Sequence, residues 1–330
     1  MKNLLLSLLF IAGNCFSFSL TGSGTPEDPF IITNVHELQE IKDSLSAHYR
    51  LANDIDASVT ASWNMGDHDE DPSTPDSAMG FYPIGTSSTP FTGSLNGAGY
   101  VITNLYINRP AADLVGLFGY VVQSSIDSLG LVDNMVIGRR AIDDAGRTGG
   151  LIGYAFLQVA VSHCYTTGFV NGGAQIGGLI GHTDAAVEVN DCFTTGTIHG
   201  AGYAGGLIGN AFGATVNDSY SSATITYRGI GVGIGGLIGS SFNSSVHRSY
   251  FTGIVNGKEN CGGIVGTSNG STVVSQCFNS GTVIGETSVG GIVGSGVNSS
   301  VVRDSYSTGA VRGNYRIGGI AGISFLQAPN

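Results

Sequence analysis

Short apolar clusters recur along this chain, and glycines rather than long polar segments enclose each of them. The cluster "GGLIG" begins at residues 149, 177, 205 and 235, "GGIVG" begins at 262 and 290, and "GGIAG" begins at 318. Successive copies are therefore 28, 28, 30, 27, 28 and 28 residues apart. Motifs such as "CYTTG" and "DSYSTG" lie between them. This spacing predicts an array of structural repeats of about 28 residues.

A unit of this length and composition is compatible with few repeat folds. It contains no glycine-free amphipathic segment long enough for a helical repeat, and it is too short for a propeller blade. The leucine-rich pattern "LxxLxL" is absent from the repeats. We therefore predict an all-β fold, a right-handed parallel β-helix (β-solenoid) with one coil of about three short strands per repeat.

Stacked coils place equivalent residues about 4.8 Å apart, so residues 27 to 30 apart in the chain become neighbours. The apolar positions of the GGLIG-type clusters are expected to form an inward column: Leu179, Leu207, Leu237, Ile264 and Ile292. The 53 glycines are expected at corners, where the backbone needs a positive φ or approaches another strand closely.

The N-terminal part of the chain departs from the repeat pattern. Residues 1–19 carry one Lys, an apolar run and then small residues, which predicts a signal peptide. Lipidation at Cys15 is an alternative there. Residues 20–48 predict an N-terminal cap, with a strand at 30–33 and a helix from about Val35 to Leu45 that has Asn34 as its N-cap. The solenoid is expected over 49–330, with regular repeats from about 115 to 322.

On these motifs the chain resembles the GLUG-motif repeat family. The leader "GTPEDPFIITNVHELQEI" and the block "FYPIG…FTGSLNGAGYVITNLYI" also look like the segments that precede such repeats. The family consists of secreted or surface β-solenoids of bacteria, including adhesin-like proteins and non-catalytic regions of immunoglobulin-A-cleaving zinc peptidases. The resemblance implies an architecture and a secreted or cell-surface location, and it supplies no reaction.

Charge and hydropathy narrow the possible partners. The formal net charge is −11, and no cluster of Lys and Arg interrupts it, so nucleic acid is not an expected partner. After the leader no segment approaches 20 continuous apolar residues, so no transmembrane segment is expected after signal removal.

Two groups of potential metal-binding residues have simpler interpretations. "HELQE" at residues 36–40 has Glu40 where a zinc peptidase motif needs its second His, so we interpret His36 and Glu37 as helix surface. The acidic segment with Asp67, Asp69, Glu70, Asp71 and Asp76 fails the EF-hand pattern and is interpreted as a solvated loop. No metal and no cofactor are therefore predicted.

Cysteine and serine share one column of the repeats. Cys164, Cys192 and Cys277 occupy this column in three rungs, and Ser219, Ser249 and Ser305 occupy it in the others, which favours a small buried corner position. A disulfide between Cys164 and Cys192 is an alternative, although side chains that point in parallel disfavour its geometry.

The position before this column is polar in every rung. It reads His163, Asp191, Asp218, Arg248, Gln276 and Asp304. One interpretation is a catalytic site of His163, Asp191, Asp218 and Arg248, in which neighbouring carboxylates raise one pKa as a general acid requires. The other is an exposed column with the cross-rung pairs His163–Asp191 and Asp218–Arg248, and we prefer it.

The position after the cysteine column is aromatic in every rung: Tyr165, Phe193, Tyr220, Tyr250, Phe278 and Tyr306. If this column is exposed, it is a candidate binding surface for a sugar or a protein. If it is buried, it is part of the core. The residue pattern favours the buried interpretation but does not decide between the two.

Together these features predict a secreted or cell-surface scaffold that recognises an extracellular glycan or protein and is not an enzyme. A polysaccharide lyase or glycoside hydrolase with the cross-rung acidic site is the alternative. A passive structural component of the cell envelope is a third possibility.

Overall fold

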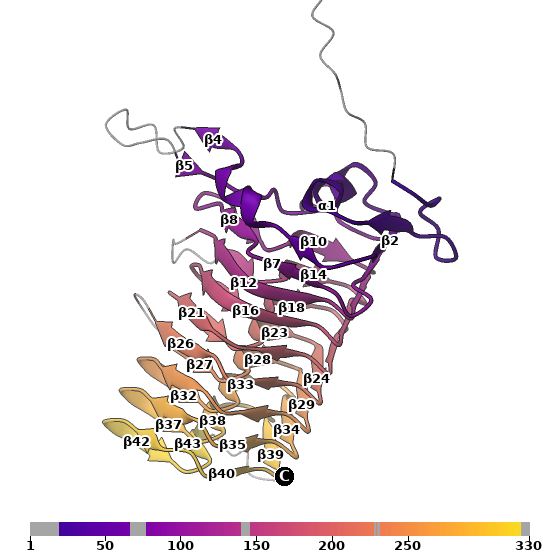
Figure 1. The fold of residues 1–330 in the computed structure, drawn as a ribbon. Helices are drawn as coiled ribbons and strands as arrows, with labels where there is room; N and C mark the ends of the chain where they lie inside the picture. The colour runs from indigo at the N-terminus through magenta and orange to yellow at the C-terminus, as the bar shows by residue number, and fades with distance from the viewer. Residues whose placement is uncertain (1–19, 67–76, 140–145, 228, 230–231, 325–330) are drawn as a thin grey trace, which may run out of the picture.

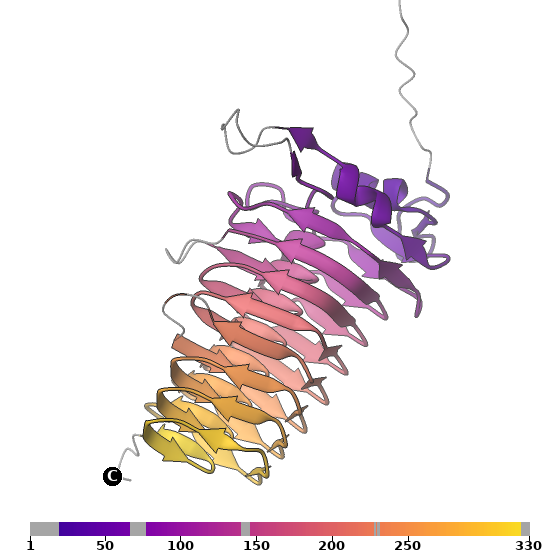
Figure 2. The ribbon, with the colours of Figure 1, turned by 60° about the vertical axis from the view of Figure 1, so that its left-hand side comes forward.

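The computed structural model describes residues 20–66, 77–139, 146–227, 229 and 232–324. The chain forms a parallel β-solenoid of about eight turns with rungs of about 28 residues (Figures 1 and 2), as the repeat spacing predicted. Among the described residues the strands form four parallel sheets and one small antiparallel pair, β4 (Met65–Gly66) with β5 (Ser77–Ala78).

The first two sheets in each turn are the ten-stranded sheet 1 and the fifteen-stranded sheet 2. Sheet 1 contains β1 (Phe30–Ile32), β2 (His48–Leu51), β6 (Ser94–Asn96), β11 (Ser125–Asp127), β15 (Ala160–Ser162), β19 (Val187–Asn190), β24 (Ala214–Asn217), β29 (Ser245–His247), β34 (Val273–Ser275) and β39 (Val301–Arg303). Sheet 2 contains β3 (Ile55–Asp56), β7 (Val101–Thr103), β8 (Tyr106–Asn108), β12 (Gly130–Ile137), β16 (Tyr165–Asn171), β20 (Phe193–Thr194), β21 (Thr197–Gly200), β25 (Tyr220–Ser221), β26 (Thr224–Tyr227), β30 (Tyr250–Phe251), β31 (Ile254–Asn256), β35 (Phe278–Asn279), β36 (Thr282–Ile284), β40 (Tyr306–Ser307) and β41 (Val311–Arg312).

The GGLIG-type clusters connect the remaining two sheets, which have eight strands each. Sheet 3 contains β9 (Leu114–Val115), β13 (Arg147–Gly149), β17 (Gln175–Gly177), β22 (Tyr203–Gly205), β27 (Val232–Gly235), β32 (Glu259–Gly262), β37 (Thr287–Gly290) and β42 (Tyr315–Gly318). Sheet 4 contains β10 (Phe118–Val122), β14 (Ile152–Phe156), β18 (Ile180–Asp184), β23 (Ile208–Phe212), β28 (Ile238–Phe242), β33 (Val265–Asn269), β38 (Val293–Gly296) and β43 (Ala321–Ser324).

A turn contains more strands than the three that the sequence suggested. The turn from residue 187 to residue 212 consists of β19, β20, β21, β22 and β23. β20 and β21 both pair with the single long strand β16, and they are separated by Gly196, whose φ is +94°. A side chain is strained at such a φ, so glycine allows one strand to become two shorter ones. Each rung is therefore a more sharply bent coil than we predicted.

The register of the strands confirms the predicted columns. The amide of Leu207 donates to the carbonyl of Leu237 in the next turn, at 2.9 Å. Both side chains are fully buried, as are the equivalents in neighbouring turns: Leu151, Leu179, Ile264 and Ile292. Residues 27 to 30 apart in the chain are thus spatial neighbours, and the apolar column is the centre of the core.

Close backbone approach, rather than a positive φ, explains the glycines of the GGLIG-type clusters. A Cβ on Gly205 would lie 2.0 Å from the carbonyl oxygen of Ile208 in the same turn. A Cβ on Gly209 would lie 2.4 Å from the amide nitrogen of Ile176 in the preceding turn. Sheets 3 and 4 therefore pack against each other at backbone distance, and the glycines recur because this contact recurs in every rung.

The cysteine and serine column is a hydrogen-bonded ladder. The amide of Cys164 donates to Sγ of Cys192 at 3.4 Å, and the amide of Cys192 donates to Oγ of Ser219 at 3.0 Å. The cysteines at 164, 192 and 277 are buried free thiols, so the alternative of a Cys164–Cys192 disulfide is not observed. The column needs a small side chain whose γ atom accepts a hydrogen bond from the preceding rung.

This ladder predicts different outcomes for two small substitutions at Cys192. Cys192→Ser should leave stability nearly unchanged, because a hydroxyl accepts the same hydrogen bond that Ser219 accepts one rung later. Cys192→Ala should lower the free energy of unfolding by about 1–3 kcal/mol, because the buried amide of Cys164 loses its acceptor. Urea unfolding of both variants measures the difference, and equal stabilities would contradict the role of the γ atom.

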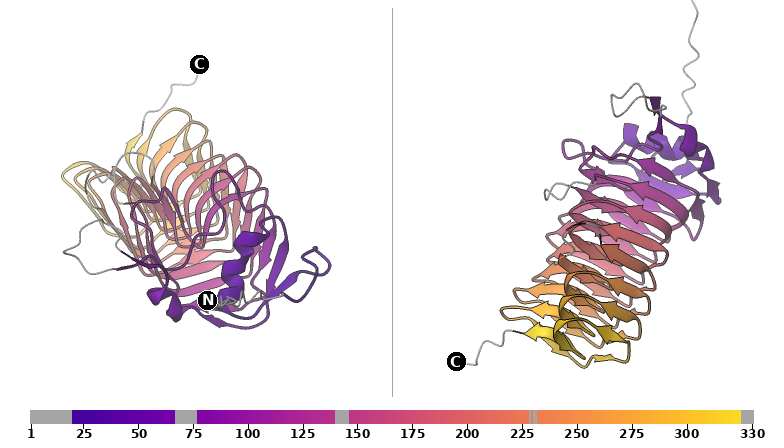
Figure 3. Two further views of the ribbon diagram at one scale, coloured as in Figure 1. Left: turned by 90° about the horizontal axis from the view of Figure 1, so that it is seen from above. Right: turned by 90° about the vertical axis from the view of Figure 1, so that its left-hand side faces the viewer.

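The N-terminal elements lie over one end of the stack (Figures 1 and 3). Helix α1 (Val35–Glu40) continues as a 3-10 turn over Ile41–Asp43, so the helical segment is slightly shorter than we predicted. Asn34 is its N-cap, with a side chain that accepts from the amides of His36 and Glu37. β1 is the terminal strand of sheet 1. The segment 1–19, for which the sequence predicts a signal peptide, lies outside the described residues, and this prediction and the domain boundaries stay untested.

Candidate functional site

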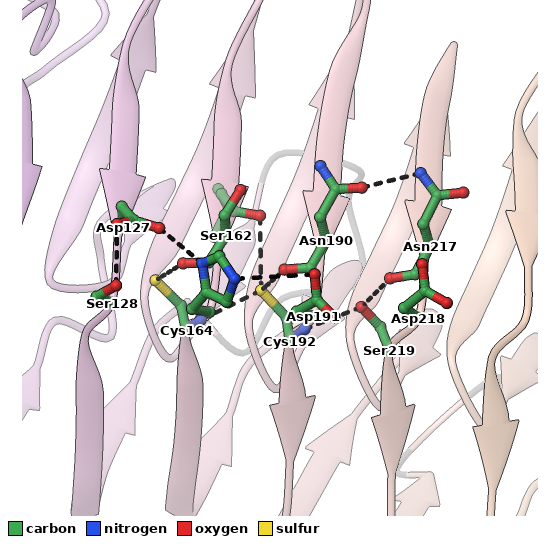
Figure 4. Close-up of polar contacts among 12 residues, drawn as sticks. Asp127, Ser128, Ser162, Cys164, Asn190, Asp191, Cys192, Asn217, Asp218 and Ser219 are labelled. Carbon is green, nitrogen blue, oxygen red and sulfur yellow. Dashed lines mark hydrogen bonds and ion pairs between the residues drawn. The ribbon is translucent and has the colours of Figure 1, made fainter. Parts of the chain in front are cut away.

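The polar column lies at the corner between sheets 1 and 2, one residue before the cysteine and serine ladder (Figure 4). All six residues have left-handed backbone conformations, with φ from +48° to +55°. The column comprises His163, Asp191, Asp218, Arg248, Gln276 and Asp304. The corner itself requires this conformation, and the six side chains are exposed. The sequence predicted the alignment but not the backbone strain that non-glycine residues carry there.

His163 pairs mainly with a residue that sequence reasoning missed. Its Nδ1 lies 3.0 Å from Oδ1 of Asp127, whereas its Nε2 lies 3.9 Å from Oδ2 of Asp191. The hydrogen bond with Asp127 is the main cause that raises the pKa of His163. Asp127 ends β11 one rung earlier, in "SIDSLGL". Asp127 pairs in register with Ser162, so an alignment extended by one rung places Ser128 in the polar column and Asp127 one position before it.

Asp218 and Arg248 form the predicted cross-rung ion pair. Nε of Arg248 donates to Oδ1 of Asp218 at 2.8 Å, and Nη2 donates to Oδ2 at 2.6 Å. This bidentate contact lowers the pKa of the Asp218 carboxyl. A general acid needs a raised pKa, so Asp218 does not suit that role in the catalytic interpretation of the column.

Two hollows in the described part of the chain lie near its N-terminal end, away from the polar column. One is lined by residues between 79 and 87 and between 109 and 114, and the other by Gln39, Lys42, Ser62, Trp63, Asn64 and Tyr82. Neither lining includes a residue of the column. Within the described ranges, no group of three or more His, Cys, Asp and Glu side chains is arranged to hold a metal ion. The acidic segment at Asp67 to Asp76 lies outside these ranges.

The aromatic column forms one continuous stack. Successive ring centroids lie 4.6, 4.9, 4.8, 4.8 and 5.6 Å apart, and the planes of neighbouring rings differ by at most 10°. We call this set the aromatic ladder: Tyr165, Phe193, Tyr220, Tyr250, Phe278 and Tyr306. The ring of Tyr165 lies against Gly130 of the preceding rung, where a Cβ would be only 2.5 Å from the ring.

The ladder lies on the outer surface rather than in the core. Its side chains are half-buried except Tyr306, which is 56% exposed, while the next residue in most of these rungs, such as Thr194, is buried. Strand residues alternate between faces, so the rings point outward. Each ring covers the faces of its neighbours, and the ladder therefore presents ring edges and tyrosine hydroxyls. At Tyr306 the stack ends, and one ring face has no further ladder member against it.

The remaining candidates from the sequence have structural roles. His36 lies on helix α1, where its ring contacts the ring of Trp63 at a centroid distance of 5.0 Å. The carboxylate of Glu37 accepts from the amide and the hydroxyl of Thr33 at 2.7 and 2.8 Å. These contacts fix the start of the helix, in agreement with our interpretation of "HELQE" as helix surface.

Comparison with known proteins supports the fold and finds two relatives that are similar to part of this chain. No family model matches the chain. It is 35% identical over 172 residues to halomucin of Haloquadratum walsbyi. The aligned region covers 50% of this chain and 2% of halomucin. It is 34% identical over 116 residues to a "Putative Gly-rich membrane protein" of Evansella cellulosilytica. That aligned region covers 34% of this chain and 11% of the relative. The chain thus spans a small part of each relative.

A solved structure has the same architecture over most of its length. The crystal structure of a "putative immunoglobulin A1 protease" from Bacteroides ovatus matches 78% of this chain and 77% of that chain, with a TM-score of 0.55 and 22% sequence identity. At this identity the similarity establishes the fold alone. In the described part of the chain, no helix is long and apolar enough to cross a membrane.

Proposed function

We propose that this chain is a secreted or cell-surface scaffold that binds a glycan or protein partner along the aromatic ladder and catalyses no reaction on it. The observation that carries this proposal is the ladder itself, six aromatic rings in register on the outer surface. Partly exposed aromatic side chains are typical of binding surfaces because they bury much area at little entropic cost.

The stacked geometry restricts the kind of contact that the ladder makes. Neighbouring rings cover each other's faces along the ladder, so a sugar ring cannot stack on an aromatic face between two members. The ladder instead offers a straight row of ring edges and hydroxyl groups spaced by about 4.8 Å, the spacing of β-strands. This row suits an extended partner, either a polysaccharide chain or a protein segment that lies along the solenoid axis.

Two further observations support the location and the non-catalytic role. One relative is named "Halomucin" and the other "Putative Gly-rich membrane protein", and these names fit a secreted or surface protein. The charge of Asp218 is compensated by Arg248, which supports a non-catalytic role for this residue. A passive structural role in the cell envelope is the alternative that requires no partner.

The ladder gives a sharp test of binding. The double variant Tyr220→Ser/Tyr250→Ser should weaken binding to a partner found on a glycan array or on cell surfaces by at least tenfold, because it interrupts the ladder at its centre. The matched control is Phe212→Ser/Phe242→Ser. These two residues are each 37% exposed, and their rings contact each other across neighbouring turns at a centroid distance of 5.3 Å, but they lie on sheet 4.

The outcomes separate the three functions. Loss of binding in the ladder variant but not in the control supports the proposal, whereas equal binding by both would remove the ladder as the binding surface. No signal on the array together with no binding to cells favours the passive structural role. New reducing or unsaturated ends in polysaccharides, abolished by Asp191→Asn, would establish the lyase or hydrolase alternative instead.

A further inference from the structure

A separate pocket lies at the N-terminal end of the solenoid, away from the ladder. It has a volume of about 480 Å³ and lies between residues 79–87 and the segment 109–114 that follows β8. This volume is in the range of small-molecule sites. Much of its wall is apolar, formed by Met79, Pro83, Pro110, Ala112 and Leu114. The pocket is therefore large enough for one or two sugar rings and has few groups that would fix a ligand.

Arg109 is the charged group that this pocket buries. Its side chain is only 7% exposed, and its Nη2 donates to the carbonyl oxygens of Gly80 and Phe81 at 3.2 and 3.5 Å. Nη1 contacts the thioether of Met79 at 3.8 Å. Among the described residues, Nε has no hydrogen-bond acceptor. These partners are neutral, so none of them compensates the guanidinium charge.

The acidic residue of the pocket is already paired with another arginine. Oδ1 of Asp113 lies 3.0 Å from Nη1 of Arg139. Burial is the main cause that lowers the pKa of Arg109, and among the described residues no carboxylate acts on it. A buried charge is costly unless an opposite charge compensates it. The pocket therefore has a local positive charge in a chain whose net charge is −11.

Tyr82 provides an aromatic wall beside this charge. The guanidinium carbon of Arg109 lies 4.6 Å from the centroid of the Tyr82 ring, and the residue is 51% exposed. Its backbone is held by one side chain, because Gln39 donates to the Tyr82 carbonyl at 2.9 Å and accepts from its amide at 2.7 Å. Helix α1 thus fixes the position of Tyr82 through the backbone, independently of the ring.

We propose that this pocket binds a sugar acid, with Arg109 pairing with the carboxylate and Tyr82 and the apolar wall covering the ring. An arginine matches a carboxylate through two parallel hydrogen bonds, and its Nη1 hydrogens face no stronger acceptor than a thioether in the described structure. This inference deepens the proposed binding function and rests on it for the choice of a sugar as the ligand.

Titration with monosaccharides tests the pocket directly. Galacturonate and glucuronate, added to the wild-type protein in isothermal titration or saturation-transfer NMR, should bind at least tenfold more tightly than galactose, which lacks the carboxylate. Succinate, a carboxylate without a sugar ring, should also bind at least tenfold more weakly than the uronates. The affinity for the uronates should fall as the salt concentration rises, because the contact is an ion pair.

Two substitutions and one control assign the residues. Arg109→Met and Tyr82→Ala should each weaken uronate binding by at least tenfold, and Tyr82→Ala should keep the loop in place because Gln39 bonds the Tyr82 backbone. The matched control is Arg316→Met. Arg316 also lies over a tyrosine ring, that of Tyr315 at 5.0 Å, but it is exposed at the other end of the solenoid. Its removal should leave uronate binding unchanged.

The inference is overturned if galactose or succinate binds as tightly as galacturonate. It is also overturned if no uronate binding is detected at a uronate concentration of about 20 mM, where even millimolar affinities would be visible. It is also overturned if Tyr82→Ala and Arg109→Met bind as the wild type does. Failure of this site does not remove the proposed function. A glycan-array signal that survives in Arg109→Met and is lost in the ladder variant would retain the ladder and exclude the pocket.

Discussion

Gly206→Ala is expected to lower the free energy of unfolding by at least about 3 kcal/mol. A Cβ at this position would lie 2.1 Å from the carbonyl oxygen of Gly236 in the next turn and 2.4 Å from the hydroxyl of Ser221. The first neighbour is backbone and is held by the parallel sheets, so the clash cannot be relieved by a rotamer change. The two turns must separate, and an interface between turns is the unit of stability in a solenoid. Urea unfolding measures the loss.

The last copy of the motif provides a matched control. Gly319 is the second glycine of "GGIAG", as Gly206 is of "GGLIG". A Cβ at Gly319 would meet no atom within 4 Å among the described residues. Gly319→Ala should therefore leave stability nearly unchanged. Equal effects of the two substitutions would show that the glycine is needed for its φ and ψ angles rather than for the contact between turns.

His182→Asn is expected to remove a large part of the acid sensitivity of the protein. The His182 ring is enclosed by Tyr154 and Phe212, at centroid distances of 4.7 and 5.7 Å. Burial, with a smaller contribution from Arg147, lowers the pKa of His182 from 6.5 to about 3. The unfolded chain therefore takes up a proton as the pH falls below 6.5, whereas the folded chain does not until the pH approaches 3.

The sign of this effect is destabilisation on acidification. At neutral pH the imidazole is uncharged in both states and contributes no pH dependence. Below pH 6.5 the penalty grows to about 2 kcal/mol at pH 5, and it levels off below pH 3. In His182→Asn the midpoint of urea unfolding should change less between pH 7 and pH 4 than in the wild type. Asn210 occupies the same column one turn later, so asparagine fits this environment.

An exposed histidine serves as the comparison. Asp127 raises the pKa of His163, so this histidine stabilises the fold below its unfolded pKa and loses that contribution as the pH rises. His163→Gln should therefore shift the pH dependence in the opposite direction and by less, since the side chain is solvated. If His182→Asn and the wild type lose stability equally between pH 7 and pH 4, burial of a neutral His182 is not the cause of acid sensitivity.

The repeat spacing predicted the fold because a solenoid converts a period in the chain into a distance in space. The inward column at Leu207 and Leu237, the pairing of Asp218 with Arg248 and the common column of Cys164 and Cys192 all follow from the alignment of repeats. Asn34 as the helix N-cap follows from local hydrogen-bonding chemistry. Each of these inferences needs only residues that are close in sequence or one period apart.

Predictions that depend on where the chain bends within each turn were less successful. The aromatic ladder could not be assigned to the surface from its pattern, since the corner before Tyr165 and the kink at Gly196 interrupt the alternation of strand residues. The same corner gives His163 and its equivalents a positive φ, which could not be predicted from a column of mixed residue types. Asp127 could not be found from the polar column because it belongs to the neighbouring column, in register with Ser162.

The pocket at Arg109 is the feature that could least be predicted from the sequence. Its residues come from loops outside the periodic part of the chain, and their meeting depends on how Gln39 of helix α1 holds the backbone of Tyr82. By itself the sequence determined a stack of 28-residue turns, its apolar core and the identity of the surface columns. Only the tertiary structure decided which columns face solvent, which charges are compensated and where a hollow forms, because these depend on the angles between sheets and on non-repeating contacts.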